Sequence, residues 1–365
     1  MAKLLFFALL LSVAGCSGKP KPYTVGAAGP WNTDYGLENL QGVRLAVEEI
    51  NRAGGINGRL LRVIEKDDAG TGAGAAGVAE EFIAQPDVAA VIGHVNSSGT
   101  LASARVYDGE LAAVATSASS PDLSGISKWV FRVISSDSLN GVAMAQFAST
   151  LGAAGTTPTA SVLYENNTYG RGLADAFRRS FRGTLISMDP INADLPTAEP
   201  YISFLKPRNP DILFVAGRVA SGLKIIHEAR RQGFNPVFLG GDGWQGIVTD
   251  TAAAEGAYIG MSFTPEDPTP AARAFVAAFR KKFNTVPDAH VALAYDATML
   301  IAQALRERGD DRKAIRDYLA GLTAATAYPG LTGPVYFEKT GDPVGIRFRV
   351  FKVQRGLLTV PPAGT

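Results

Sequence analysis

The stretch VAAVIGHVNSSGTLASARVYDGELAAVATSASSPDL, residues 88–123, decides the fold of this chain. It contains two short apolar runs, residues 88–92 and 111–115, and each run ends abruptly in small polar residues. A continuous apolar run of about five residues followed by a polar turn is typical of a strand buried in a parallel sheet. Residues 99–108, between the runs, carry apolar side chains at helical spacing. The stretch therefore predicts a strand–helix–strand unit.

Both predicted strand ends open into loops that are rich in serine. The first loop contains Ser97 and Ser98, and the second contains Ser117, Ser119 and Ser120. Ligands of open parallel sheets bind outside the carboxyl ends of the strands. Free N–H groups at a helix start, with hydroxyls around them, suit an anion such as a carboxylate. The two loops are a candidate for half of a small-molecule site, and the alternative is that the serines only cap helices.

Outward from this unit, strands and helices alternate along the chain. Before and just after it, strands are expected at 23–28, 60–66 and 128–134, and helices at 37–52 and 75–84. The pattern restarts with helices at 139–151, 171–181 and 223–232 among strands at 160–164, 185–188, 211–216, 237–239 and 258–263. Helices at 270–283, 290–308 and 312–321 and strands at 333–337 and 346–353 follow. This order predicts two α/β halves built on doubly wound parallel sheets.

Length and composition agree with a globular chain of two lobes. The 365 residues exceed one compact core, and 46% of them are hydrophobic. The formal net charge of +1 gives no electrostatic reason to expect a nucleic-acid partner. The single cysteine excludes an internal disulfide.

The N-terminus accounts for that cysteine. A basic start is followed by an apolar core at residues 4–13, which is too short to span a bilayer and is typical of a signal peptide. The small residues before Cys16 resemble the lipobox of bacterial lipoproteins. We therefore expect residues 1–16 to be a lipoprotein signal peptide with Cys16 acylated, and residues 17–22 to be a tether. Several acyl chains would anchor the protein at the periplasmic or cell surface. The alternative is an ordinary secretory signal with an incidental cysteine.

Six short motifs carry a resemblance that covers nearly everything after Pro22. They are YG at 35–36 leading into NRAGGING at 51–58, KDDA at 66–69, VIGH at 91–94, SSPDL at 119–123, YGRG at 169–172 and LTGP at 331–334. With these motifs the chain resembles the substrate-binding proteins of branched-chain amino acid ABC transporters, which are type I periplasmic binding proteins.

The resemblance implies an α/β fold of two Rossmann-like lobes with a cleft between them. Three crossovers are expected near 135–137, 261–265 and 333–335. Lobe 1 would then comprise residues 23–135 and 263–333, and lobe 2 residues 136–262 and 334–365. A ligand that bridges the lobes favours a closed form, and a permease in the inner membrane would recognise that closed form.

The resemblance also implies which residues bind the ligand: Tyr35, Ser97, Ser98, Ser117, Ala118, Ser119, Tyr169, Arg218 and Asp242. Ser97 and the loop at 117–119 would bind an α-carboxylate, and Ser119 stands where a threonine also contacts the ammonium. Asp242 would receive the α-ammonium in place of a glutamate, and the two tyrosines would form walls. A zwitterion needs donors at one end and a carboxylate at the other.

Two departures from the family pattern concern this site. Arg218 stands where an aromatic side chain is usual, and Asp242 is one methylene shorter than glutamate. Because an unpaired arginine is costly in an aliphatic pocket, we expect a ligand with a polar or anionic distal group, or an amine or amide, instead of leucine. The alternative is that Arg218 turns outward or pairs with a neighbouring carboxylate. The family's disulfide is also missing, since Ala69 and Asn96 occupy those positions.

Signals for catalysis or cofactors are weak. Residues 72–77, GAGAAG, match G-x-G-x-x-G, but they follow the second strand and lack an acidic residue about twenty positions on. The three histidines have no metal-ligand spacing, and no G-x-S-x-G occurs. We therefore expect no enzyme activity, no cofactor and no metal. The sequence predicts an extracytoplasmic solute-binding lipoprotein that feeds an ABC importer, with a ligand-sensing receptor of the same fold as the alternative.

Overall fold

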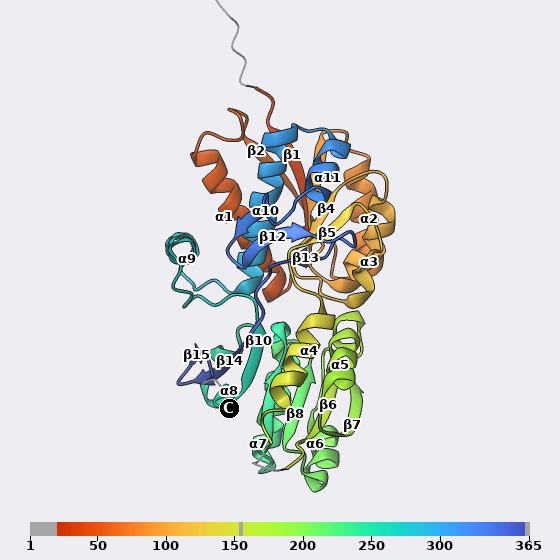
Figure 1. The fold of residues 1–365 in the computed structure, drawn as a ribbon, viewed down its shortest axis with the longest axis vertical. Coiled ribbons are helices and arrows are strands. Elements are labelled where there is room, and N and C mark those ends of the chain that lie inside the picture. The colour runs from red at the N-terminus through yellow and green to blue at the C-terminus, as the bar shows by residue number, and fades with distance from the viewer. Residues whose placement is uncertain (1–19, 153–155, 362–365) are drawn as a thin grey trace, which may run out of the picture.

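The structure is a computed structural model that describes residues 20–152 and 156–361. The predicted signal peptide and Cys16 lie outside the described residues. Two α/β lobes are stacked along the long axis of the molecule (Figure 1). We call the lobe built on the five-stranded sheet the first lobe and the lobe built on the seven-stranded sheet the second lobe. The predicted fold of two Rossmann-like lobes is confirmed.

The sheet of the first lobe is entirely parallel and has the strand order β2-β1-β3-β4-β5. Its strands are β1 (Tyr23–Gly29), β2 (Leu61–Asp67), β3 (Val88–Ile92), β4 (Ala113–Ala115) and β5 (Val130–Arg132). The chain winds from β1 to β2 on one side and returns to β3 on the other. The loops after β1 and β3 therefore diverge at a topological switch point, where open α/β sheets bind ligands.

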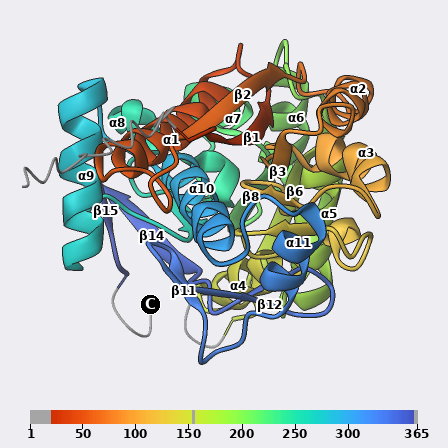
Figure 2. The same cartoon turned by 90° about the horizontal axis from the view of Figure 1, so that it is seen from above.

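Helices cover both faces of this sheet. The helices of this lobe are α1 (Asp34–Arg52), α2 (Gly72–Ile83), α3 (Ser97–Tyr107), α9 (Pro270–Phe283), α10 (Ala289–Arg308) and α11 (Arg312–Ala320). One face packs its apolar side chains against α1 and α10, and the other packs against α2 and α3. Viewed from above, α9 stands at the edge of the lobe (Figure 2), where Phe275 and Phe279 pack with Leu45 and Val291.

The sheet of the second lobe has the order β15-β14-β10-β9-β8-β6-β7, with β14 and β15 antiparallel to their neighbours. Its strands are β6 (Thr159–Glu165), β7 (Thr184–Ile191), β8 (Ile212–Ala216), β9 (Val237–Gly240), β10 (Tyr258–Met261), β14 (Arg349–Gln354) and β15 (Leu357–Thr359). Its helices are α4 (Asp137–Ala148), α5 (Thr168–Ser180), α6 (Glu199–Leu205), α7 (Val219–Arg231) and α8 (Thr251–Ala254). Here the switch point lies between β6 and β8, so the loops after these two strands diverge there.

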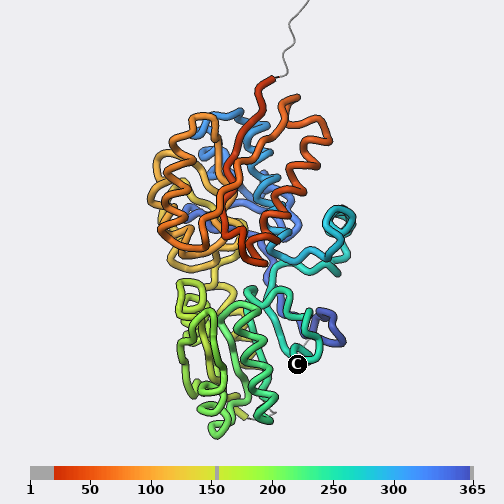
Figure 3. Tube along the Cα trace, turned by 180° about the vertical axis from the view of Figure 1, so that it is seen from behind, coloured from red at the N-terminus to blue at the C-terminus, as the bar shows by residue number. Residues whose placement is uncertain are grey.

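The chain passes between the lobes at three places (Figure 3). The first passage lies between β5 and α4, and the second between β10 and α9. The third lies later than the expected position near residues 333–335. Strands β11 (Tyr328–Gly330), β12 (Gly333–Phe337) and β13 (Pro343–Val344) form a small sheet on the first lobe, and Ile346 still packs against its core. After this small sheet, Phe348 is the first residue whose side chain packs in the core of the second lobe. Residues 334–346 therefore belong to the first lobe.

Within the described ranges, 20–152 and 156–361, no helix has the length and apolar character required to cross a bilayer.

Candidate functional site

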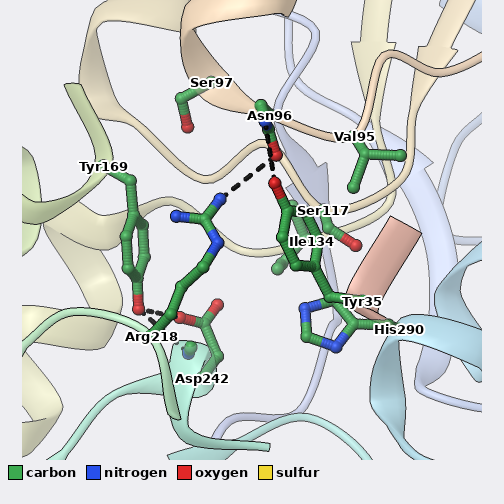
Figure 4. A pocket seen from close by; sticks show the side chains of 11 residues that line it. Tyr35, Val95, Asn96, Ser97, Ser117, Ile134, Tyr169, Arg218, Asp242 and His290 are labelled. Carbon is green, nitrogen blue, oxygen red and sulfur yellow. Dashed lines mark hydrogen bonds between the residues drawn. The ribbon is translucent and has the colours of Figure 1, made fainter. Parts of the chain in front are cut away.

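A pocket lies between the lobes, where the loops of the two switch points meet. From the first lobe it is lined by Tyr35, Val95, Asn96, Ser97, Ser117, Ile134 and His290, and from the second by Tyr169, Arg218, Asp242 and Gly243 (Figure 4). Its inner space is about 30 Å³, and two adjoining pockets of about 500 and 410 Å³ share Tyr35 and Arg218 with it. We call the three the inner, large outer and small outer pockets.

Hydroxyls and a helix start form the first-lobe side of the inner pocket. Ser97 is the first residue of α3, is 4% exposed, and accepts a hydrogen bond at Oγ from the Ser120 N–H at 3.2 Å. The Ser117 hydroxyl accepts one from Asn39 Nδ2 at 3.3 Å. The first N–H groups of α3 have no partner within the helix. This side therefore suits a carboxylate.

An anchored carboxylate forms the second-lobe side. The Tyr169 hydroxyl donates to Asp242 Oδ1 at 2.8 Å and accepts from the Gly243 N–H at 2.9 Å. Glycine permits this approach, because a Cβ on Gly243 would lie 2.7 Å from the Tyr169 hydroxyl. Burial raises the pKa of Asp242 above its usual range. A cationic group in the pocket would favour the ionised form of this buried carboxylate.

Arg218 lies between these two sides and comes from the end of β8. Its Nη2 donates to Asn96 Oδ1 at 3.1 Å, and its Nη1 lies 3.4 Å from Glu165 Oε2. The guanidinium lies 4.5 Å from the centre of the Tyr35 ring and 5.7 Å from that of Tyr169. Figure 4 shows it between the two rings, with Ser97 and Asp242 on opposite sides. Arg218 therefore both lines the pocket and pairs with a neighbouring carboxylate, instead of turning outward.

The inner pocket brings together six of the nine residues that the resemblance implies, and Ser98 lines the small outer pocket. Ala118 and Ser119 are absent from the lining of all three. The Ser119 side chain is fully buried and donates to Asp137 Oδ2 at 2.9 Å, while the Ala118 carbonyl accepts from Arg132 at 3.4 Å. Ala118 and Ser119 therefore face these partners inside the protein, while Ser117 of the same loop lines the inner pocket.

Three acidic or imidazole side chains that sequence reasoning missed meet beside the inner pocket. One ligand atom each of Glu38, Asp288 and His290 lies within 4.8 Å of the others, an arrangement that could hold a cation. Both oxygens of Asp288 already accept, from the Val291 N–H at 3.0 Å and in a contact with His290 Nδ1 at 3.0 Å. No spacing rule could find this group, because Glu38 is far from the other two in the chain. The expectation of no metal rested on histidine spacing alone.

The same cluster predicts a pH effect on stability. Burial, with Asp288 adding to it, raises the pKa of Glu38 to about 7 from an ordinary 4.5. The folded protein thus holds this proton more tightly than the unfolded chain, and Glu38 contributes stability that is lost as pH rises from about 4.5 to about 7. Relative to Glu38→Gln, the wild type should lose about 1–2 kcal/mol of unfolding free energy across that window.

Urea unfolding at a series of pH values measures this difference. Glu307→Gln, at an exposed position of α10, is the control and should run parallel to the wild type. If the Glu38→Gln and wild-type curves run parallel from pH 4.5 to 8, the carboxyl does not titrate in this window.

Comparison with known proteins gives one family and several relatives that match most of the chain. Residues 23–356 match the family described as "Periplasmic binding protein". The leucine-, isoleucine-, valine-, threonine- and alanine-binding protein of Pseudomonas aeruginosa is 27% identical, over 90% of this chain and 89% of its own. The Leu/Ile/Val/Thr-binding protein of Salmonella typhimurium is 28% identical, over 94% of each.

Solved structures agree with these relatives. The substrate-binding protein of a branched-chain amino acid transporter from Streptococcus pneumoniae, in complex with isoleucine, superposes with a TM-score of 0.84 at 26% identity, covering 93% of this chain and 98% of its own. An ABC transporter substrate-binding protein from Desulfitobacterium hafniense, in complex with leucine, gives 0.78 at 27% identity, covering 93% and 99%.

Proposed function

This chain belongs to the periplasmic binding protein family, and on that premise we propose that it captures an amino acid or a related small polar molecule and delivers it to an ABC importer. The observation that carries the proposal is the inner pocket, where Asp242 of one lobe stands across from Ser97 and Ser117 of the other. Relatives named for binding leucine, isoleucine and valine support the class of ligand.

In this proposal the two lobes hold opposite ends of a zwitterion. The carboxylate of the ligand accepts from the hydroxyls of Ser97 and Ser117 and from the first N–H groups of α3. The ammonium donates to Asp242, which lines the inner pocket on the side of the second lobe. Each charge-assisted hydrogen bond contributes roughly 1.5–3 kcal/mol in such a site. Because the two ends of the ligand contact different lobes, the ligand binds the closed form better than the open form. The closed form is therefore populated mainly when the ligand is bound.

Gln245 supplies a direct closing contact between the lobes. It follows β9 in the second lobe, and its Oε1 accepts from the N–H groups of Ala289 and His290, at 2.6 and 3.2 Å, at the start of α10 in the first lobe.

We expect Gln245→Ala to weaken ligand affinity about 10-fold, because the variant leaves two helix N–H groups unpaired in the closed form only. Calorimetry gives the affinity, and small-angle scattering gives the degree of closure. Unchanged affinity together with unchanged closure would contradict this role.

We also propose that the chain works outside the cytoplasm as a lipoprotein. Acylation of Cys16 and the tether at residues 17–22 would hold the lobes near a membrane, within reach of a permease. No catalytic step is part of this proposal: the ligand is released as it was bound.

The proposal is tested by titrating the mature chain with amino acids and their amides in a calorimeter. At least one should bind with a Kd near micromolar, which is about 8 kcal/mol. Uptake of that compound by cells that carry the partner permease should then depend on this chain. Chemical turnover of the ligand, or the absence of binding by every compound, would refute the proposal. Binding without import would favour a sensing role.

A further inference from the structure

Arg218 is the group that divides the cleft between the lobes. It precedes α7 as the N-cap residue and lines all three pockets, so any ligand larger than the inner space of about 30 Å³ must lie against it or displace it. Among the described residues that line these pockets, no other lysine or arginine occurs. The side chain is 28% exposed, so its charge is partly withdrawn from solvent.

The guanidinium has weak partners for its charge. Within the described chain it makes two hydrogen bonds, at 3.1 Å to an amide oxygen of Asn96 and at 3.4 Å to Glu165. The Glu165 carboxylate is shared: it also accepts from the Arg218 N–H, from Ser221 Oγ and from Asn167 Nδ2, at 2.8, 2.9 and 3.0 Å. Arginine has five N–H donors in a planar fork that matches a carboxylate in a bidentate pair. Arg218 makes no such bidentate pair with Glu165, since only its Nη1 is within reach of that carboxylate, at 3.4 Å.

The surroundings hold this fork in place over the inner pocket. The rings of Tyr35 and Tyr169 flank the guanidinium on both sides, which favours a cation between them. Asn96 is itself fixed, because its Nδ2 donates to the Tyr35 hydroxyl at 3.1 Å and to the Gly70 carbonyl at 3.4 Å. Only its oxygen is therefore turned to Arg218. A carboxylate would be a stronger acceptor than this neutral amide oxygen.

We infer that the ligand carries a second acidic group, and that Arg218 is the residue that selects it. The ligand class is an amino acid with a distal carboxylate, which takes the guanidinium in place of the Asn96 oxygen. The α-carboxylate and ammonium remain on the two sides described above, so this inference rests on the proposed function and names its substrate class. An aliphatic side chain in the same place would desolvate the guanidinium and leave it with only the single 3.4 Å contact to Glu165 as a charged partner.

Titration calorimetry with aspartate, glutamate, asparagine, glutamine and leucine tests the inference on the wild type and on two variants. We expect the wild type to bind one of the two acids at least 100-fold more tightly than its amide. Arg218→Met, which keeps the length of the side chain and removes its charge, should lose that preference. Arg231→Met, at an exposed position of the same helix α7 where the arginine pairs with Glu228, should keep it. Thermal unfolding of Arg218→Met checks that the variant is folded.

The outcomes distinguish failure of the acidic-ligand inference from failure of the proposed solute-binding function. If the wild type binds leucine or a neutral amide as tightly as the acids, or if folded Arg218→Met keeps the preference for the acid, the inference is wrong and the proposed function stands. If Arg218→Met is unfolded, Arg218→Lys serves in its place and should lower the preference by at least 10-fold, because an ammonium cannot make the bidentate pair. If no amino acid binds the wild type, the proposed function fails, and the inference fails with it.

Discussion

Replacing Asp242 by alanine is expected to abolish ligand binding at ordinary ligand concentrations, with a loss of affinity of at least 100-fold. The carboxylate is 7% exposed and is fixed by the Tyr169 hydroxyl at 2.8 Å. In the proposed complex it is the partner of the ligand's ammonium. Removing it leaves a buried cation without a counter-charge, which costs more than the roughly 1.5–3 kcal/mol of the hydrogen bond alone. A loss of about 2.7 kcal/mol already corresponds to 100-fold.

Two further variants separate charge from shape at this position. Asp242→Asn keeps the size of the side chain and should lose nearly as much affinity as alanine, because only the charge is removed. Tyr169→Phe keeps the carboxylate and loses its anchoring hydroxyl, so a smaller loss of about 10-fold is expected.

Folding stability provides the control for the Asp242 variants. Because burial raises the pKa of Asp242, the ionised group does not favour the folded state, and neither variant should unfold the second lobe. Calorimetry and thermal unfolding on the same samples decide the matter. A folded Asp242→Ala protein that binds with wild-type affinity would show that the ammonium is held elsewhere.

Replacing Arg132 by methionine is expected to destabilise the first lobe by about 3–5 kcal/mol, which is the usual cost of breaking a buried ion pair from one side. Arg132 is 2% exposed and ends β5. Its Nε donates to Asp342 Oδ1 at 2.7 Å, in the turn between β12 and β13. Its remaining donors reach the Ser120 carbonyl at 2.8 Å and the Ser124 hydroxyl at 2.9 Å. One side chain thus ties the serine loop after β4 to the small sheet near the third crossover.

Urea unfolding measures the effect of Arg132→Met. Lys313→Met is the control: this lysine pairs with Asp317 on the surface of α11, is 74% exposed, and should change the free energy of unfolding by less than about 0.5 kcal/mol. If Arg132→Met unfolds within 1 kcal/mol of the wild type, the ion pair does not hold these two segments together.

Much of the fold could be predicted from local patterns. The buried run at 88–92 forms β3 as expected, and the helix after it begins at Ser97, two residues earlier than predicted. The strand at 128–134 is shorter than predicted, and α6 and β11 were missed, because short elements carry little periodicity. The third crossover was placed too early, since the pairing of Arg132 with Asp342 spans 210 positions and leaves no local signal.

The site was predictable in outline but not in its contacts. Ligands of open parallel sheets bind outside the carboxyl ends of the strands, so the loops that carry Ser97, Tyr169 and Asp242 could each be expected at such an end. Their identity as candidates, however, came from the family resemblance. His290 and Gln245 could not be singled out, because their place at the cleft depends on a contact between the lobes, in which Gln245 accepts from the N–H groups of Ala289 and His290.

By itself, the sequence determined the order of strands and helices, the two α/β halves and the loops that could carry a site, because apolar runs and helix starts are properties of neighbouring residues. The tertiary structure alone decided that Arg218 meets Asn96, 122 positions away, and that the Ser119 hydroxyl bonds to Asp137 and stays outside the pocket lining. These pairings depend on how two lobes pack against each other, and no pattern of neighbouring residues encodes the distance between side chains on different lobes.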